Sequence, residues 1–137
     1  MITRLRPGRA VLSVAAAAAL SAGAASYSSA AAAVASLTNA DNARTVAVHL
    51  GDTVQVRLTP VRGDGVQWVW NVPTASDPGL LARATGSAAP DGGAAATFEA
   101  QEAGSGSVTA QAVCRPTAPG ARCPAAAMSW NVTVDVQ

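Results

Sequence analysis

The chain of 137 residues carries eight acidic residues and nine basic ones, and all nine basic residues are arginines. Three of these arginines precede residue 10, so residues 36–137 keep six arginines against eight acidic residues, a net charge of −2. This mildly acidic balance provides no electrostatic footprint for nucleic acid or for an anionic membrane, and it excludes functions that depend on a strongly basic surface.

The first third of the chain has the order of segments found in a secretory signal peptide. Three arginines form a basic start, an apolar run follows at 10–20, and small residues continue to about Ala35. We predict a signal peptide over residues 1–35, with cleavage after Ala25, Ala33 or Ala35 left open. The product would be secreted into the extracellular space and free of the membrane. A retained anchor is the alternative, but serine and glycine interrupt the apolar stretch well before the roughly 18 residues that a membrane-spanning helix needs.

From residue 44 onward apolar residues alternate with polar ones, which is the pattern of half-buried antiparallel strands. Clusters of glycine and proline separate the runs, and no helical pattern of useful length appears. We expect strands at 44–50, 53–59, 66–72, 79–84, 95–100, 106–114 and 127–136, the fourth of them at a sheet edge. Six or seven short strands predict an all-β fold, an immunoglobulin-like antiparallel β-sandwich over 44–137. We expect a monomer, with a flexible leader at 36–43.

The core of this sandwich is expected to be thin, because many inward positions are alanine and the chain has three Trp, one Phe and one Tyr. Trp68, Trp70 and Trp130 share the parity of the neighbouring valines, and Phe98 lies in its own short strand. We predict that all four are buried. Truncating one buried large aromatic residue to alanine typically costs about 3–5 kcal/mol, so these positions would carry much of the stability.

Cys114 and Cys123 are the only cysteines, and an even number in a small exported domain predicts one disulfide. Zinc would require further ligands that the single histidine, His49, cannot supply. Paired thiols leave no cysteine nucleophile, the carboxylates are scattered, and no glycine loop opens a helix to cradle phosphate. We therefore expect a protein that is not an enzyme, with no catalytic residues, no metal and no cofactor.

Three connections at one end of such a sandwich are the longest and the richest in glycine and proline, namely 59–65, 85–94 and 114–126. The disulfide would close a short ring in the third connection and add about 2–3 kcal/mol by cross-linking. A stiff loop loses little entropy on binding, which suits a binding module. A disulfide that only stabilises a thin-cored domain is an equally good interpretation.

The first connection contains Arg62-Gly63-Asp64, the tripeptide of animal adhesion ligands. A turn with glycine is required between the flanking strands in any case. The lack of lysine and the excess of alanine point to a GC-rich bacterial genome, whereas integrins are animal receptors. We therefore attribute the tripeptide to the turn and not to integrin binding.

The three connections resemble the loops of the chagasin-type inhibitors of papain-like cysteine proteases, over about residues 44–136. VHLGDTVQVRL is similar to the first hairpin of that family, and TPVRGDGVQW, PDGGAAATF and CRPT stand where the family has its three binding loops. The resemblance implies an immunoglobulin-like fold whose loops enter the protease cleft. It also implies protease contacts from Thr59, Pro60, Gly63, Gly65, Gly92, Gly93, Arg115, Pro116 and Thr117.

The chain departs from the family pattern at Thr59, where asparagine is typical, at Thr117, where an aromatic residue is typical, and in having the disulfide. The resemblance implies a secreted inhibitor with a papain-like cysteine protease as its partner. The alternative is a generic exported immunoglobulin-like module that binds a cell-envelope or extracellular partner without inhibiting a protease.

Overall fold

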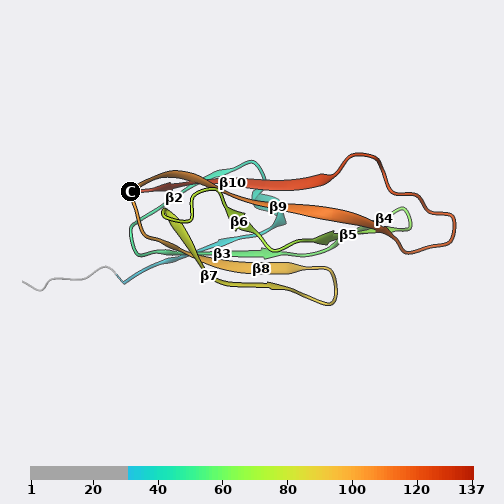
Figure 1. The fold of residues 1–137 in the computed structure, drawn as a ribbon, viewed down its shortest axis with the longest axis horizontal. Coiled ribbons are helices and arrows are strands. Elements are labelled where there is room, and N and C mark those ends of the chain that lie inside the picture. The colour runs from blue at the N-terminus through green and yellow to red at the C-terminus, as the bar shows by residue number, and fades with distance from the viewer. Residues whose placement is uncertain (1–30) are drawn as a thin grey trace, which may run out of the picture.

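Two β-sheets pack face to face in the computed structural model, which describes residues 31–137 (Figure 1). Residues 1–30 lie outside the described residues, and with them most of the predicted signal peptide. The first sheet has the strand order β1 (Val34–Leu37), β3 (Thr53–Leu58), β8 (Ala94–Ala100) and β7 (Leu81–Ala88). The second has the order β2 (Thr45–Val48), β10 (Met128–Val136), β9 (Gly104–Pro116), β5 (Val66–Trp70) and β4 (Val61–Gly63), and β6 (Thr74–Ala75) pairs with β9. The predicted all-β sandwich is confirmed.

The seven predicted strands correspond to β2, β3, β5, β7, β8, β9 and β10. Most neighbouring strands are antiparallel, as predicted, but β1 runs parallel to β3 and β2 runs parallel to β10. Residues 31–137 form ten strands, so the expected count of six or seven was too low. The unpredicted strands β1, β4 and β6 have four, three and two residues, which is too short for an alternating pattern to be recognised.

The segment 36–43 takes part in the fold instead of forming a flexible leader. It begins within β1 and continues into a short 3-10 helix, η1 (Asn39–Asp41). Because β1 belongs to the first sheet and β2 to the second, the chain crosses between the sheets here, and we call residues 36–43 the crossing segment. Leu37 is 3 % exposed and lies in the core, which explains why this segment folds onto the sandwich. The predicted boundary at residue 35 therefore falls inside β1, whereas cleavage after Ala25 would leave that strand whole.

The core consists of the inward residues of both sheets, and Trp70, Phe98 and Trp130 are buried there as predicted, with exposed fractions of 4 %, 0 % and 1 %. The alternation of β3 and β10 buries their valines at the same time. Trp68 differs from the prediction, because it is only half-buried at the margin of the core. Its strand neighbours are Val61 on β4 and Cys114 on β9, so Trp68 lies where the second sheet extends toward the loops.

Two buried indoles connect this core to the backbone around it. Trp130 Nε1 donates a hydrogen bond to the Thr38 carbonyl at 3.0 Å, and Trp70 Nε1 donates one to the Thr59 carbonyl at 2.8 Å. The Asn39 side chain donates to the same Thr59 carbonyl at 2.9 Å and accepts the Thr59 N–H at 2.8 Å. The crossing segment is thereby joined to the beginning of the first connection, 59–65.

At the opposite end of the sandwich, Asp52 holds the turn between β2 and β3. Its carboxylate accepts the backbone N–H of His49 at 2.8 Å and that of Ala33 at 3.0 Å. These hydrogen bonds, that of His49 first, lower the pKa of Asp52 below its ordinary value, and the nearby imidazole of His49 acts in the same direction. The Ala33 contact also fixes the chain just before β1.

The lowered pKa of Asp52 predicts a stability that depends on pH. Since the native pKa lies below the unfolded value of about 3.9, the ionised carboxylate stabilises the fold above that pH, and this stabilisation is lost as the pH falls through the native pKa. Asp52→Asn should therefore unfold more easily than the parent near neutral pH, with the difference shrinking in acid. Urea unfolding at a series of pH values measures it.

The matched control is Asp135→Asn, because no hydrogen bond to the Asp135 carboxylate occurs within residues 31–137. This substitution should have little effect on stability near neutral pH, because it removes no hydrogen bond. A difference between Asp52→Asn and the parent that stays unchanged from neutral to acidic pH would contradict the role of the charged carboxylate.

Candidate functional site

The three candidate connections lie at the same end of the sandwich. Leu58, the last residue of β3, is paired with Ala94, the first residue of β8, and Ala94 is paired with Ala88, the last residue of β7. In the second sheet the last residue of β9, Pro116, is paired with the first residue of β5, Val66. Strand pairing therefore brings the connections 59–65, 89–93 and 117–127 to one end of the molecule.

The first connection is mostly a β-hairpin and not an irregular loop. Val61, Arg62 and Gly63 of β4 pair with Trp68, Gln67 and Val66 of β5. The turn between them consists of Asp64 and Gly65, both with positive φ, at 53° and 73°. Two such residues between paired strands make the type I′ geometry, for which Asp-Gly is a favoured sequence. This turn accounts for the aspartate and glycine after Arg62-Gly63, in agreement with our interpretation of the tripeptide.

The third connection folds against this hairpin turn. The Gly65 carbonyl accepts the backbone N–H of Thr117 at 2.8 Å and that of Ala118 at 3.2 Å. A Cβ atom on Gly65 would lie 3.0 Å from Ala121 Cβ and 3.2 Å from Ala118 Cβ. The turn and the third connection therefore touch so closely that a side chain on Gly65 would force the third connection to shift by a few tenths of an ångström.

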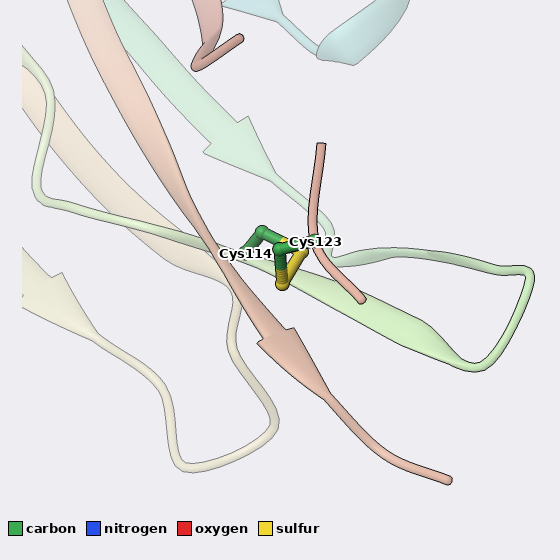
Figure 2. Close-up of a disulfide and its surroundings, with 2 residues drawn as sticks. All are labelled: Cys114 and Cys123. Carbon is green, nitrogen blue, oxygen red and sulfur yellow. A yellow bond between two sulfur atoms is a disulfide. The ribbon is translucent and has the colours of Figure 1, made fainter. Parts of the chain in front are cut away.

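The predicted disulfide joins Cys114 and Cys123, with a Cα–Cα distance of 5.7 Å, and ties the third connection back to β9 (Figure 2). We call residues 61–68 together with residues 113–127 the arm. In Figure 1 the arm extends beyond the turn that joins β7 to β8. Trp68 packs against the margin of the core, and the rest of the arm is held by strand pairing, by the Gly65 contacts and by the disulfide.

The second connection lies at the base of the arm, not at its tip. Trp70 N–H donates to the Gly92 carbonyl at 2.9 Å, and Gln67 Nε2 donates to the Asp91 carbonyl at 2.6 Å. A Cβ atom on Gly92 would lie 2.8 Å from Gln67 Nε2, and one on Gly93 would lie 2.8 Å from the Leu58 carbonyl. Gly93 is therefore required by close packing against backbone, and Gly92 is favoured by its positive φ of 97°. Both glycines are buried and have a structural role within the domain.

The nine predicted contact residues fall into two groups. At the base, Pro60 lies beside the glycines of the second connection, and Thr59 is held by Asn39. The base group is Thr59, Pro60, Gly92 and Gly93, and the tip group is Gly63, Gly65, Arg115, Pro116 and Thr117. Arg115 and Pro116 are the last two residues of β9 and not loop residues, since that strand is longer than predicted.

Sequence reasoning missed the residues that hold these groups in place. Asn39 was assigned to a flexible leader, and nothing in the sequence indicated that its side chain would bond the backbone of Thr59, 20 residues away. Ala118 and Ala121 contact Gly65 but are ordinary alanines in an alanine-rich chain. The Asp64-Gly65 pair was the one usable signal, because Asp-Gly between alternating runs predicts a hairpin.

One shallow cleft lies at this end of the molecule. It has a volume of about 370 Å³ and lies between the hairpin and the third connection, with Trp68, Arg122 and Pro124 among its lining residues.

Among residues 31–137 no group of three or more His, Cys, Asp or Glu side chains is close enough to hold a metal ion. The described chain also contains no helix that is long and apolar enough to cross a membrane.

The similarity to known proteins lies in the structure and not in the sequence. No family model matches the sequence, and no curated protein matches it. The cysteine protease inhibitor EhICP2 from Entamoeba histolytica matches with a TM-score of 0.51 and 16 % identity, covering 77 % of this chain and 96 % of that chain. The chain thus has the fold of EhICP2. The predicted resemblance is confirmed at the level of the fold.

Two other solved structures match with lower TM-scores. Amebosin matches with a TM-score of 0.44 and 19 % identity, covering 77 % of this chain and 98 % of that chain. PbICP-C, solved in complex with falcipain-2, matches with a TM-score of 0.45 and 15 % identity, covering 75 % of this chain and 99 % of that chain.

The contact between Gly65 and the third connection can be tested by a matched pair of substitutions. Gly65→Ala and Gly120→Ala each place a side chain at positive φ, at 73° and 76°, but nothing lies within 4 Å of a Cβ on Gly120. Both should pay about 1 kcal/mol for the left-handed backbone, and Gly65→Ala should cost about 1–3 kcal/mol more from overpacking. Urea unfolding measures both. Equal destabilisation would show that the turn does not pack against the third connection.

Proposed function

We propose that this protein is a secreted, non-enzymatic inhibitor of papain-like cysteine proteases that acts through the arm and the second connection. The observation that carries the proposal is the single end of the sandwich at which all three candidate connections meet. The fold shared with EhICP2, a cysteine protease inhibitor, supports the same proposal. The sequence segments that resemble the family's loops lie in these connections.

The arm has the stiffness that blocking a cleft requires. A loop that becomes ordered only when it binds loses conformational entropy at that moment, and this loss weakens binding. Here the hairpin turn is fixed by its own geometry, by two hydrogen bonds from the third connection and by the disulfide. The positive φ at Asp64 and Gly65 also keeps the turn from presenting the extended backbone that a protease cleaves, so the arm would occupy the cleft without being a good substrate.

Each group of candidate residues has a distinct part in this proposal. Gly63 and Gly65 bring side-chain-free backbone to the tip, where the active-site cleft is narrow. Arg115, Pro116 and Thr117 would contact the rim beside it. Gly92 and Gly93 are buried, and they let the second connection pack closely against the base of the arm and so fix its position. The partner is the protease, and the residues assign no role to a metal or cofactor.

Secretion is part of the proposal, and the disulfide is its main structural support. Disulfides persist in oxidising compartments and are rare in the cytosol, and Cys114 and Cys123 are bonded. Cleavage of the signal peptide after Ala25 would retain β1 and the Ala33 contact to Asp52. We propose that the exported chain acts as a monomer.

Titration of papain with the purified exported chain tests the proposal. Activity should fall at inhibitor concentrations of about 1 µM or lower, corresponding to a binding free energy of about −8 kcal/mol or stronger. Trypsin, a serine protease with a different active site, is the control and should keep its activity. Full papain activity at about 100 µM inhibitor would refute inhibition of this enzyme class by a complex tighter than about −5.5 kcal/mol.

Removal of the disulfide separates inhibition from the alternative of a generic exported module. The double variant Cys114→Ala/Cys123→Ala should lose about 2–3 kcal/mol of stability, because the unfolded chain is no longer cross-linked. It should also inhibit papain more weakly at a temperature where it is still folded, since the third connection is free to move. A variant with lower thermal stability and unchanged inhibition would show that the disulfide only stabilises the domain.

A further inference from the structure

The charges of residues 31–137 are divided between the arm and the rest of the domain. The arm carries three arginines and one aspartate, a net charge of +2, whereas the remainder carries three arginines and seven acidic residues, a net charge of −4. The arm charges are Arg62, Arg115, Arg122 and Asp64. The others are Arg44, Arg57, Arg83, Asp41, Asp52, Asp77, Asp91, Glu99, Glu102 and Asp135. A domain that is acidic overall thus has a basic end.

The arginines of the arm have no partner within the described part of the chain. The ion pairs there are Arg44 with Asp41 and His49 with Asp52, neither of which involves the arm. Arg62, Arg115 and Arg122 are all exposed. Their guanidinium groups are therefore available to carboxylates of another molecule.

Strand register places two of these arginines on one face of the arm. Arg62 is paired with Gln67, and Gln67 is paired with Arg115, so the three residues form a row across β4, β5 and β9. With neighbouring strands about 4.8 Å apart, the two arginine backbones lie roughly 10 Å from each other. This spacing suits two carboxylates on a surface better than a single one.

The third arginine borders the cleft between the hairpin and the third connection. Val61, Val66, Trp68 and Pro124 give that cleft an apolar lining, and Arg62, Arg122 and one acidic residue, Asp64, line it as well. Two arginines against one aspartate leave the lining with a net positive charge. Such a recess fits an aromatic or aliphatic side chain that has a carboxylate near it, because a guanidinium offers a planar pair of donors to a carboxylate.

We propose that the basic arm docks on an acidic rim of its target, and that the cleft at Trp68 receives an apolar side chain next to a rim carboxylate. This inference rests on the proposed function, and it specifies which papain-like proteases are bound fastest: those with acidic residues around the active-site cleft. The acidic remainder of the domain is repelled by the same rim, so the charge division orients the inhibitor arm-first as it approaches. Steering of this kind raises association rate constants by about 10–1,000-fold and weakens with salt.

Association rates of the double variant Arg62→Glu/Arg122→Glu test the inference. Stopped-flow inhibition would be measured against two papain-like proteases, one with an acidic and one with a basic isoelectric point, at low and high NaCl. With the acidic protease, the parent should associate faster at low salt than at high salt. At low salt the double variant should associate about tenfold more slowly than the parent. The difference between parent and variant should shrink at high salt, and the basic protease should show no such loss.

Arg83→Glu is the matched control, because Arg83 is an exposed arginine on β7 opposite Phe98, away from the arm. It should leave the association rate nearly unchanged, and circular dichroism should show all variants folded. If the proteases are inhibited but the association rate constant changes neither with salt nor with the arm substitutions, the acidic-rim inference is overturned and the proposed function is left intact. An absence of inhibition of both proteases by the parent would overturn the proposed function and this inference together.

Discussion

The indole N–H of Trp70 joins the core of this protein to its candidate site. A buried tryptophan needs a hydrogen-bond partner for its N–H, because an unpaired polar group in the interior is costly. Trp70 finds that partner in the Thr59 carbonyl, where the first connection begins. The packing of Trp70 in the core therefore also fixes the position of Thr59, where the first connection begins. Trp130 does the same for the Thr38 carbonyl, one residue before η1.

This arrangement matters because the core is thin and the arm extends beyond it. Four buried interior positions are occupied by small alanine side chains, namely Ala94, Ala96, Ala110 and Ala112. Such a core offers few large side chains that could also pack against a projecting segment. The arm instead depends on strand pairing between β4, β5 and β9 and on a covalent link at Cys114. Beyond Trp68, which packs against the core, the contacts that hold the tip of the arm are made within the arm itself, so residues at its tip can change without removing core contacts.

The strands and the disulfide could be predicted because they follow from local rules. Alternation with period two located seven strands, and the presence of two cysteines near each other in the sequence located the disulfide. The crossing segment could not be predicted, since a four-residue strand after an alanine-rich leader has no visible alternation and the Asn39–Thr59 bonds link positions distant in sequence. Trp68 was misjudged because parity states which face a residue occupies but not whether a second sheet covers that face. The candidate loops were located at the correct end, but their division into an arm and a base depends on non-local contacts.

The departures from the family's loop residues have a physical interpretation in this structure. Thr59 lacks the carboxamide that is typical there, and Asn39 of the crossing segment bonds the Thr59 backbone with its own carboxamide. Thr117 lacks the aromatic ring, but its N–H bonds Gly65 and its neighbourhood is closed by the disulfide. In this chain the loops are thus fixed by a hydrogen bond from the crossing segment and by a cross-link. If rigidity and charge are what the proposed target recognises, the individual loop residues are free to change as long as these contacts persist.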